Sequence, residues 1–180
     1  ATEMLQLWQH SLGVSLASGV IARRIGLKDA EEVIVAGLLH DIGKVVLNVE
    51  GPEYFEQVTQ KTAEGKLLFI EAEQEILGFD HTLVGEWLCD KWNLPANLRD
   101  PITLHHTPAV AKNASEATAV VHVADVIVRA LEFGSGGDSG IPVLNREAVV
   151  TLNISISDLE EILDEMEHEL IKAEDLIPSE

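Results

Sequence analysis

The fold of this chain is decided by the stretch Gly37-Leu38-Leu39-His40-Asp41-Ile42-Gly43-Lys44, which places a histidine beside an aspartate at the end of an apolar run. A charged side chain in a protein interior is costly unless a partner neutralises it. A metal cation is such a partner. The stretch therefore predicts a buried metal site, provided that other segments of the chain supply the remaining ligands.

Apolar residues recur at helical spacing on both sides of this stretch. The first helix is expected over about 3–25, with His10 pointing into the protein. The second is expected to follow a capping box of Asp29 and Glu32 and to carry His40 on its inner face. Gly43 either ends this second helix or allows its backbone to approach a neighbouring segment closely.

The remaining segments also predict helices, so the fold class is expected to be all-α. Asp80 is expected to cap one of these helices, and Ser157 with Glu160 is expected to form a capping box for the last. These remaining helices are expected over about 52–65, 67–77, 81–92, 96–106, 116–133, 145–153 and 157–174. The sequence predicts one helical domain over 1–133, a flexible Gly/Ser loop over 134–140, and a C-terminal helical extension over 141–180 that packs on the same domain.

Charge and composition narrow the function classes. The chain has 31 acidic and 12 basic residues, a formal net charge of −19, and this surface disfavours binding to DNA. No apolar run approaches the ~20 residues of a membrane span, so no membrane insertion is expected. The single cysteine, Cys89, cannot form an internal disulfide, which fits a cytoplasmic protein. The chain begins inside a predicted helix, so a preceding region is expected to be missing.

Several histidines and aspartates lie on separate predicted helices and could converge in the interior of a bundle. They are His10, His40, Asp41, His81, His105, His106 and Asp125. Imidazole and carboxylate groups suit zinc, iron, manganese and nickel. Two adjacent histidines cannot share one direction on a helix, so His105 and His106 could serve two metals, or one metal and a substrate. His122 is expected to be a core residue or a neighbour of the site, and His168 a surface residue.

The segment from 39 to 44 resembles the signature of the HD superfamily of metal-dependent phosphohydrolases. The wider pattern resembles one branch of that superfamily, the HDOD domain (HD-related output domain) of bacterial signalling proteins. The matching pieces lie between Leu5 and Val128, and they are Leu7-Trp8-Gln9-His10-Ser11, the residues from Ala36 to Lys44, Leu77-Gly78-Phe79-Asp80-His81 with Gly85, Trp92-Asn93-Leu94-Pro95, Leu104-His105-His106-Thr107-Pro108, and Val121-His122-Val123-Ala124-Asp125.

The resemblance implies an HD-type helical bundle with two metal ions. It implies that the first metal is bound by His10, His40, Asp41 and Asp125, and the second by Asp41, His81, His105 and His106. Asp41 would then bridge the two ions and Lys44 would lie near the substrate phosphate, which makes these two the expected catalytic residues. In the related HD-GYP branch, a Gly-Tyr-Pro motif follows the double histidine. Here Thr107-Pro108-Ala109-Val110 follows it, which argues against hydrolysis of cyclic di-GMP.

Three functions remain open from the sequence. The first is a cytoplasmic bacterial signalling domain whose two divalent ions (Fe, Mn, Ni or Zn) hydrolyse a phosphodiester, a nucleotide or another phosphorylated small molecule. Two metals can hold both the attacking and the leaving oxygens of such a reaction. The second is a non-catalytic HDOD output or scaffold module that binds signalling proteins and keeps a structural or sensory metal. The third is a nucleotide sensor without hydrolysis.

Overall fold

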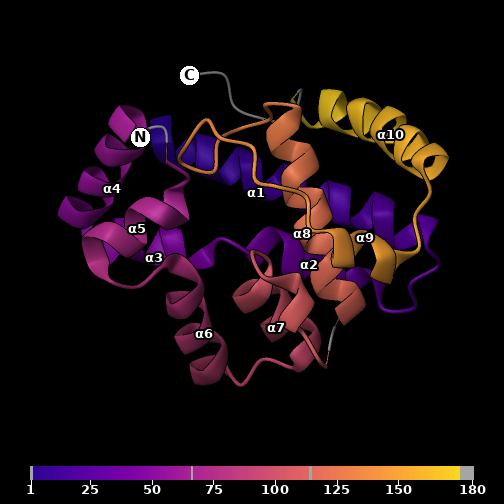
Figure 1. Ribbon diagram of the computed structural model, residues 1–180, viewed down its shortest axis with the longest axis horizontal. Helices are drawn as coiled ribbons and strands as arrows, with labels where there is room; N and C mark the ends of the chain where they lie inside the picture. The colour runs from indigo at the N-terminus through magenta and orange to yellow at the C-terminus, as the bar shows by residue number, and fades with distance from the viewer. Residues whose placement is uncertain (1, 66, 114, 175–180) are drawn as a thin grey trace.

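The computed structural model describes residues 2–65, 67–113 and 115–174, and these ranges contain helices but no strands (Figure 1). The all-α fold expected from the sequence is therefore confirmed. The helices are α1 (Thr2–Arg24), α2 (Ala30–Leu39), α3 (Ile42–Glu50), α4 (Pro52–Gly65), α5 (Phe69–Leu77), α6 (His81–Trp92), α7 (Ala96–Leu104), the short 3-10 helix η1 (Pro108–Val110), α8 (Ser115–Ala130), α9 (Arg146–Leu152) and α10 (Ile156–Glu174).

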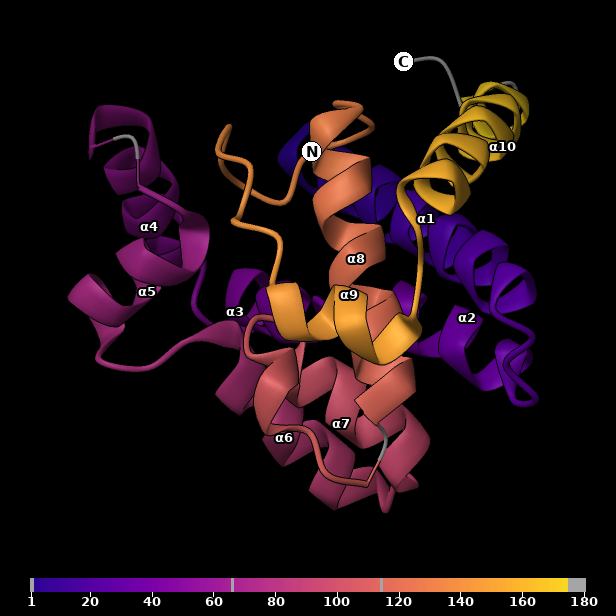
Figure 2. The same cartoon turned by 45° about the vertical axis from the view of Figure 1, so that its right-hand side comes forward.

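Helix α8 runs through the middle of the molecule, and α1, α2, α7 and α9 pack around it (Figures 1 and 2). Every side chain of α8 from Ala117 to Val128 is buried. This explains why its sequence is apolar on all sides, because a helix surrounded by others has no face for polar residues. Thr118, His122 and Asp125 are the polar residues in this buried stretch.

The C-terminal helix α10 lies along α1 (Figure 2). Its buried residues Ile162, Met166 and Leu170 join the main hydrophobic core. The division of the chain at 134–140 stays a prediction. The capping box predicted from Ser157 and Glu160 is wrong, because the reciprocal hydrogen bonds are made by Ser155 and Asp158, two residues earlier.

A second, smaller core lies between α4 and α5, where Phe55, Val58, Phe69 and Ala72 are buried together. The candidate site lies between this small core and α8. The final turn of α5 ends at Gly78, which has a left-handed conformation, and Asp80 caps α6 as expected by accepting a hydrogen bond from the Thr82 backbone N–H.

The second predicted helix is divided in two. Helix α2 ends at Leu39, His40 and Asp41 form a turn, and α3 begins at Ile42, a helix that the sequence pattern did not predict. Gly43 does not end a helix. It permits close packing, because a Cβ atom at this position would lie 2.0 Å from the carbonyl oxygen of His81. The predicted capping box at Asp29 is also wrong, since this side chain makes no capping hydrogen bond.

No helix in the described ranges is both long enough and apolar enough to cross a membrane.

Candidate metal centre

The seven side chains predicted as ligands meet at one place in the interior. Six of them are at most 2% exposed, and His106 is partly exposed. They come from α1 (His10), the turn between α2 and α3 (His40 and Asp41), the start of α6 (His81), the turn that follows α7 (His105 and His106), and α8 (Asp125). Elements that are distant in the sequence therefore supply a single cluster.

The side chains form two groups, and in each the potential ligand atoms lie within 4.8 Å of one another. One group is His10, His40 and Asp125, and the other is Asp41, His81, His105 and His106. Asp41 lies between them: Oδ2 is 3.3 Å from Nε2 of His40, and Oδ1 is 3.3 Å from Nε2 of His81. The second group equals the set that the resemblance implied for the second metal, and the first group equals the other implied set without Asp41. Metal binding by these groups stays a prediction.

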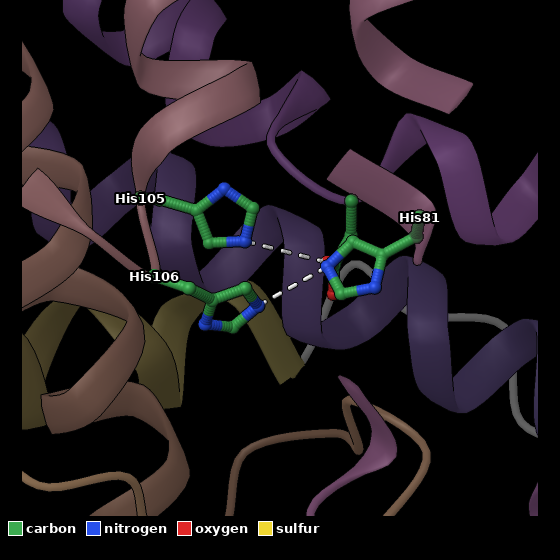
Figure 3. A group of neighbouring side chains, drawn as sticks. His81, His105 and His106 are labelled. Carbon is green, nitrogen blue, oxygen red and sulfur yellow. Dashed lines mark hydrogen bonds and ion pairs between the residues drawn. The ribbon is translucent and has the colours of Figure 1, made fainter. Parts of the chain in front are cut away.

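Figure 3 shows the rings of His105 and His106 both directed toward His81. Nε2 of His106 is 3.1 Å from Nε2 of His81, and Nε2 of His105 is 3.8 Å from Oδ1 of Asp41. Adjacent residues were expected to point in different directions. They can converge here because α7 ends at Leu104, so that His105 continues the helical backbone while His106 lies in the turn that follows.

The cluster contains polar atoms that are buried and have no hydrogen-bond partner. They include both ring nitrogens of His10, Oδ1 of Asp41, Nε2 of His105 and Oδ1 of Asp125. Buried polar groups in folded proteins are nearly always hydrogen-bonded, so an accumulation of exceptions needs a physical cause. A divalent cation in each group would be a natural partner for both the carboxylate oxygens and the imidazole nitrogens. The residues present therefore fit a metal centre.

Backbone carbonyl groups orient two of the rings. Nδ1 of His40 is 2.8 Å from the Gly37 carbonyl oxygen, and Nδ1 of His105 is 3.2 Å from the carbonyl oxygens of both Pro101 and Ile102. Donation from Nδ1 leaves Nε2 of each ring as the atom that faces the cluster. His122 does not join the cluster. Its Nδ1 lies 2.7 Å from the His105 carbonyl oxygen, so it fixes the backbone of a candidate ligand, in line with the sequence expectation.

The protonation states favour cation binding. Burial alone raises the pKa of Asp41, but His40 and Lys44 outweigh it and hold this pKa well below its ordinary value. Burial likewise raises the pKa of Asp125, and His10 brings it well below the ordinary value. Burial lowers the pKa of His105 to about 3. The centre thus presents ionised carboxylates and a neutral imidazole, the forms that bind metals.

His40 differs from the other rings. Burial lowers its pKa, but the adjacent carboxylate of Asp41 raises it above the ordinary value. Burial lowers the pKa of His10, and the carboxylate of Asp125 only partly offsets this.

Lys44 is 2% exposed, and its ammonium group is hydrogen-bonded. Nζ donates to Oδ2 of Asp41 at 2.7 Å and to the Gly136 carbonyl oxygen at 2.9 Å, and it lies 5.1 Å from the centre of the Phe69 ring. Lys44 thus neutralises Asp41 in this structure. A substrate phosphate would compete with the Gly136 carbonyl group for this ammonium group.

The segment 134–140 passes over the cluster on the side of His10 and Lys44. Gly134 has φ +67°, and a Cβ atom there would lie 2.3 Å from the His10 backbone nitrogen, so only glycine fits. Arg129 pairs with Asp138, and Asp138 accepts a hydrogen bond from the Phe69 N–H at 2.7 Å. These contacts attach the segment to α5 and α8, and its flexibility stays a prediction.

The cluster is approached from the side of His106. A cavity of about 450 Å³ has His106 in its wall, together with Phe79, Asp80, Thr82 and Arg99. None of the six more deeply buried cluster residues lines this cavity. A molecule entering from there would meet His106 first.

Sequence reasoning missed one residue of this centre, Glu73 on α5. It is 0% exposed, and its Oε2 lies 2.5 Å from Nδ1 of His81. A signal was available, because Glu73 lies four residues after Phe69 and four before Leu77, on the apolar face of the predicted helix. A charged residue at such a position indicates a buried partner.

Three comparisons relate the chain to known proteins. A family model described as the HDOD domain matches residues 1–108. The crystal structure of an HDOD domain protein with unknown function from Geobacter sulfurreducens has a TM-score of 0.80 and 31% identity, covering 93% of this chain and 60% of that one. A putative signal transduction protein from Marinobacter aquaeolei VT8 has a TM-score of 0.78 over 95% of this chain and 37% of that one, and at 19% identity it shows the fold alone.

Among curated proteins, a ribonuclease Y from Mycoplasma mycoides is 32% identical over 118 residues, which cover 66% of this chain and 21% of that protein. An uncharacterised protein from Treponema pallidum is 25% identical over 136 residues, or 72% of this chain and 26% of that protein. The chain therefore spans about a quarter of the length of the curated relatives it matches.

Proposed function

This chain belongs to the HDOD domain family, and we propose that it is a signalling domain whose buried cluster binds two divalent metal ions and hydrolyses a phosphate ester. The proposed ligands of one ion are His10, His40, Asp41 and Asp125, and those of the other are Asp41, His81, His105 and His106. Iron, manganese, nickel and zinc all suit this set of nitrogen and oxygen ligands. The proposed cellular setting is the cytoplasm.

One observation carries this proposal: Asp41 lies between two groups of buried ligand atoms, several of which have no hydrogen-bond partner. Each of its two oxygens faces one of the groups. A carboxylate with this placement can hold two cations at once. Without cations, the protein would keep these unpartnered groups buried, at a cost of about 1–3 kcal/mol for each.

When bound, the two ions would supply positive charge to the phosphoryl oxygens and activate a water molecule. The residues of the chain have other tasks. Asp41 and Asp125 provide the negative charge that retains the ions, and the surrounding helices exclude bulk water, which strengthens electrostatic interactions at the centre. Lys44 would stabilise the phosphate through its ammonium group.

The substrate is proposed to be a nucleotide, a phosphodiester or another phosphorylated small molecule that enters beside His106. The relatives named ribonuclease Y make an RNA phosphodiester one candidate for the substrate panel. The net charge of −19 works against long nucleic acids, because the surface repels their backbone. Short oligonucleotides are therefore the more suitable RNA probes.

A second candidate function is a non-catalytic output module, which binds signalling proteins and retains the metal for structure or sensing. A specific observation favours it: Lys44 is already occupied by Asp41 and by the Gly136 carbonyl group. In this arrangement two of the three N–H groups of the ammonium are already used.

The deciding experiment measures metal content first and turnover second. Metal is determined in the purified protein, and hydrolysis is then assayed with a bis-aryl phosphodiester, a nucleotide panel and short RNA. His40→Ala and Asp41→Ala are expected to lose both metal and turnover, whereas His168→Ala, at an exposed histidine far from the cluster, should retain both. Bound metal with no turnover on any substrate would favour the output module. Absence of metal after loading with each of the four ions would overturn both functions.

A further inference from the structure

Glu73 is a buried carboxylate that the proposed ligand set does not include. It is 0% exposed, and its Oε1 has no hydrogen-bond partner. Within the described residues, both hydrogen bonds of its Oε2 are made with His81, one with the ring nitrogen Nδ1 (2.5 Å) and one with the backbone nitrogen (3.2 Å). An ionised carboxylate is very costly to bury without compensation, so His81 and whatever it binds must supply that compensation.

This contact determines which nitrogen of His81 carries the proton. A carboxylate oxygen accepts hydrogen bonds, so Nδ1 must be the donor toward Glu73. The lone pair of the neutral ring is then on Nε2. This atom faces the cluster, 3.3 Å from Oδ1 of Asp41 and 3.1 Å from Nε2 of His106. Figure 3 shows this side of the ring directed toward His106.

Among the candidate ligands, His81 is unusual in having a carboxylate at its outer nitrogen. His40 and His105 donate to backbone carbonyl groups instead. A carboxylate makes the imidazole a stronger ligand than a carbonyl group does, because its negative charge stabilises the positive charge that the ring shares with a bound cation. Glu73 therefore favours the metal position that contains His81.

The backbone of His81 has anchors besides its N–H bond to Glu73. Gly43 of α3 packs so closely on the His81 carbonyl group that no side chain fits between them. Asp80 caps the same end of α6 through the Thr82 N–H at 2.9 Å. Helix α6 thus has its own N-cap and its own packing contact, whereas the outer nitrogen of the imidazole ring is held by Glu73.

We propose that Glu73 is a positioning residue of the metal centre, which fixes the tautomer of His81 and strengthens the metal position formed by Asp41, His81, His105 and His106. This inference rests on the proposed metal binding. It extends that proposal by predicting that the two metal positions differ in their dependence on α5, and that only one of them responds to a change at residue 73.

The first test is metal titration of the full chain with Co²⁺, followed by its absorption spectrum, for the native protein and Glu73→Gln. Gln is close to Glu in size but lacks the charge. We expect one of two binding steps to weaken by about 10–100-fold. Glu75→Gln is the matched control, because Glu75 is on the same helix but is exposed and pairs with Lys61. An unchanged titration in Glu73→Gln would overturn the inference, while the native protein's two steps would still support the proposed function.

A double-mutant cycle separates positioning from a general structural role. If Glu73 acts through His81, then Glu73→Gln should have little further effect on metal affinity in a His81→Ala background. Equal losses in both backgrounds would show that Glu73 acts on the fold instead. Urea unfolding of the metal-free variants provides the structural readout, and Glu73→Gln should be no less stable there than the native chain.

The tautomer can be measured without any metal. Nitrogen-15 NMR of the metal-free native protein should show His81 protonated at Nδ1, and Glu73→Gln should lose this preference. The spectrum is recorded at a pH where the ring is neutral, and a neutral His81 protonated only at Nε2 in the native protein would overturn the inference. A native protein that binds neither Co²⁺ nor any of the iron, manganese, nickel and zinc ions would overturn the proposed function and with it the metal-directed role of Glu73.

Discussion

The ammonium group of Lys44 lies 2.7 Å from a carboxylate oxygen of Asp41, and both side chains are at most 2% exposed. This ion pair is at the centre of the candidate site, because the same carboxylate also faces His40 and His81. Removing either partner would leave an uncompensated charge in the interior. Lys44 and Asp41 therefore matter for the stability of the metal-free protein as well as for any chemistry.

Replacing Lys44 tests this role. Lys44→Met should lower the free energy of unfolding of the metal-free protein by about 3–5 kcal/mol, because Asp41 loses its buried cation. Urea unfolding in the presence of a chelator measures this loss. Lys61→Met is the control: Lys61 pairs with Glu75 at the surface, and its loss should have little effect on the free energy of unfolding. Equal effects of the two substitutions would contradict the role assigned to Lys44.

Metal ions should stabilise the folded protein. An ion that binds only the native state raises the free energy of unfolding by about 2.7 kcal/mol at a concentration one hundred times its Kd. Thermal unfolding with and without Mn²⁺ or Zn²⁺ measures the shift in Tm. His10→Ala should reduce the shift, since it removes a proposed ligand, and His168→Ala should leave it unchanged. A shift of the same size in His10→Ala would argue against the site.

Gly43 should tolerate no side chain. A Cβ atom there would lie 2.0 Å from the His81 carbonyl oxygen, and both partners are backbone that cannot easily move. Gly43→Ala is expected to cost at least about 1–3 kcal/mol and to displace His81. Gly19→Ala is the matched control, because its Cβ would meet only the side chains of Ile34 and Arg23 at 3.1 Å or more. Urea unfolding and metal titration of both variants check the prediction.

The attachment of α10 should weaken in acid. Hydrogen bonds from Ser155, together with Arg24, lower the pKa of Asp158 to about 2 from its ordinary 3.8. Because this pKa is lower in the folded state, the stabilisation is complete above the unfolded value and is lost as the pH falls toward 2. Asp158→Asn should therefore destabilise the protein at pH 7. The difference in free energy of unfolding between this variant and the native chain should shrink below about pH 4. Paired urea titrations at several pH values measure this difference.

Helix positions and helix ends could be predicted from the sequence where they depend on residues that are near neighbours in the chain. Helical spacing located most helices, and Gly78 and Asp80 marked their ends because turn conformation and capping depend on near neighbours. The candidate ligands could be named in advance because histidines and carboxylates that project inward from facing helices are the usual ligands of metal sites in helical bundles.

The sequence was less informative where tertiary contacts decide. The break between α2 and α3 lies at residues with no turn signal, and it exists because His40 and Asp41 face the interior together. Both Ser155 and Ser157 are serines, so residue type does not tell which of them caps the last helix. In the structure Ser155 is the cap, and its partner Asp158 also contacts Arg24 of α1. Glu73 was missed because its partner, His81, lies on another helix.

The burial of the cluster also bears on how fast its ions could be exchanged. His10, His40 and Asp125 are all at most 2% exposed, and no member of this group lines the cavity beside His106. An ion held there could leave only when the protein opens locally, so its residence time would follow the frequency of such openings more than the strength of its ligands. The ion found in purified protein would then report which metal was abundant while the chain was folding, and a brief chelator wash would not replace it.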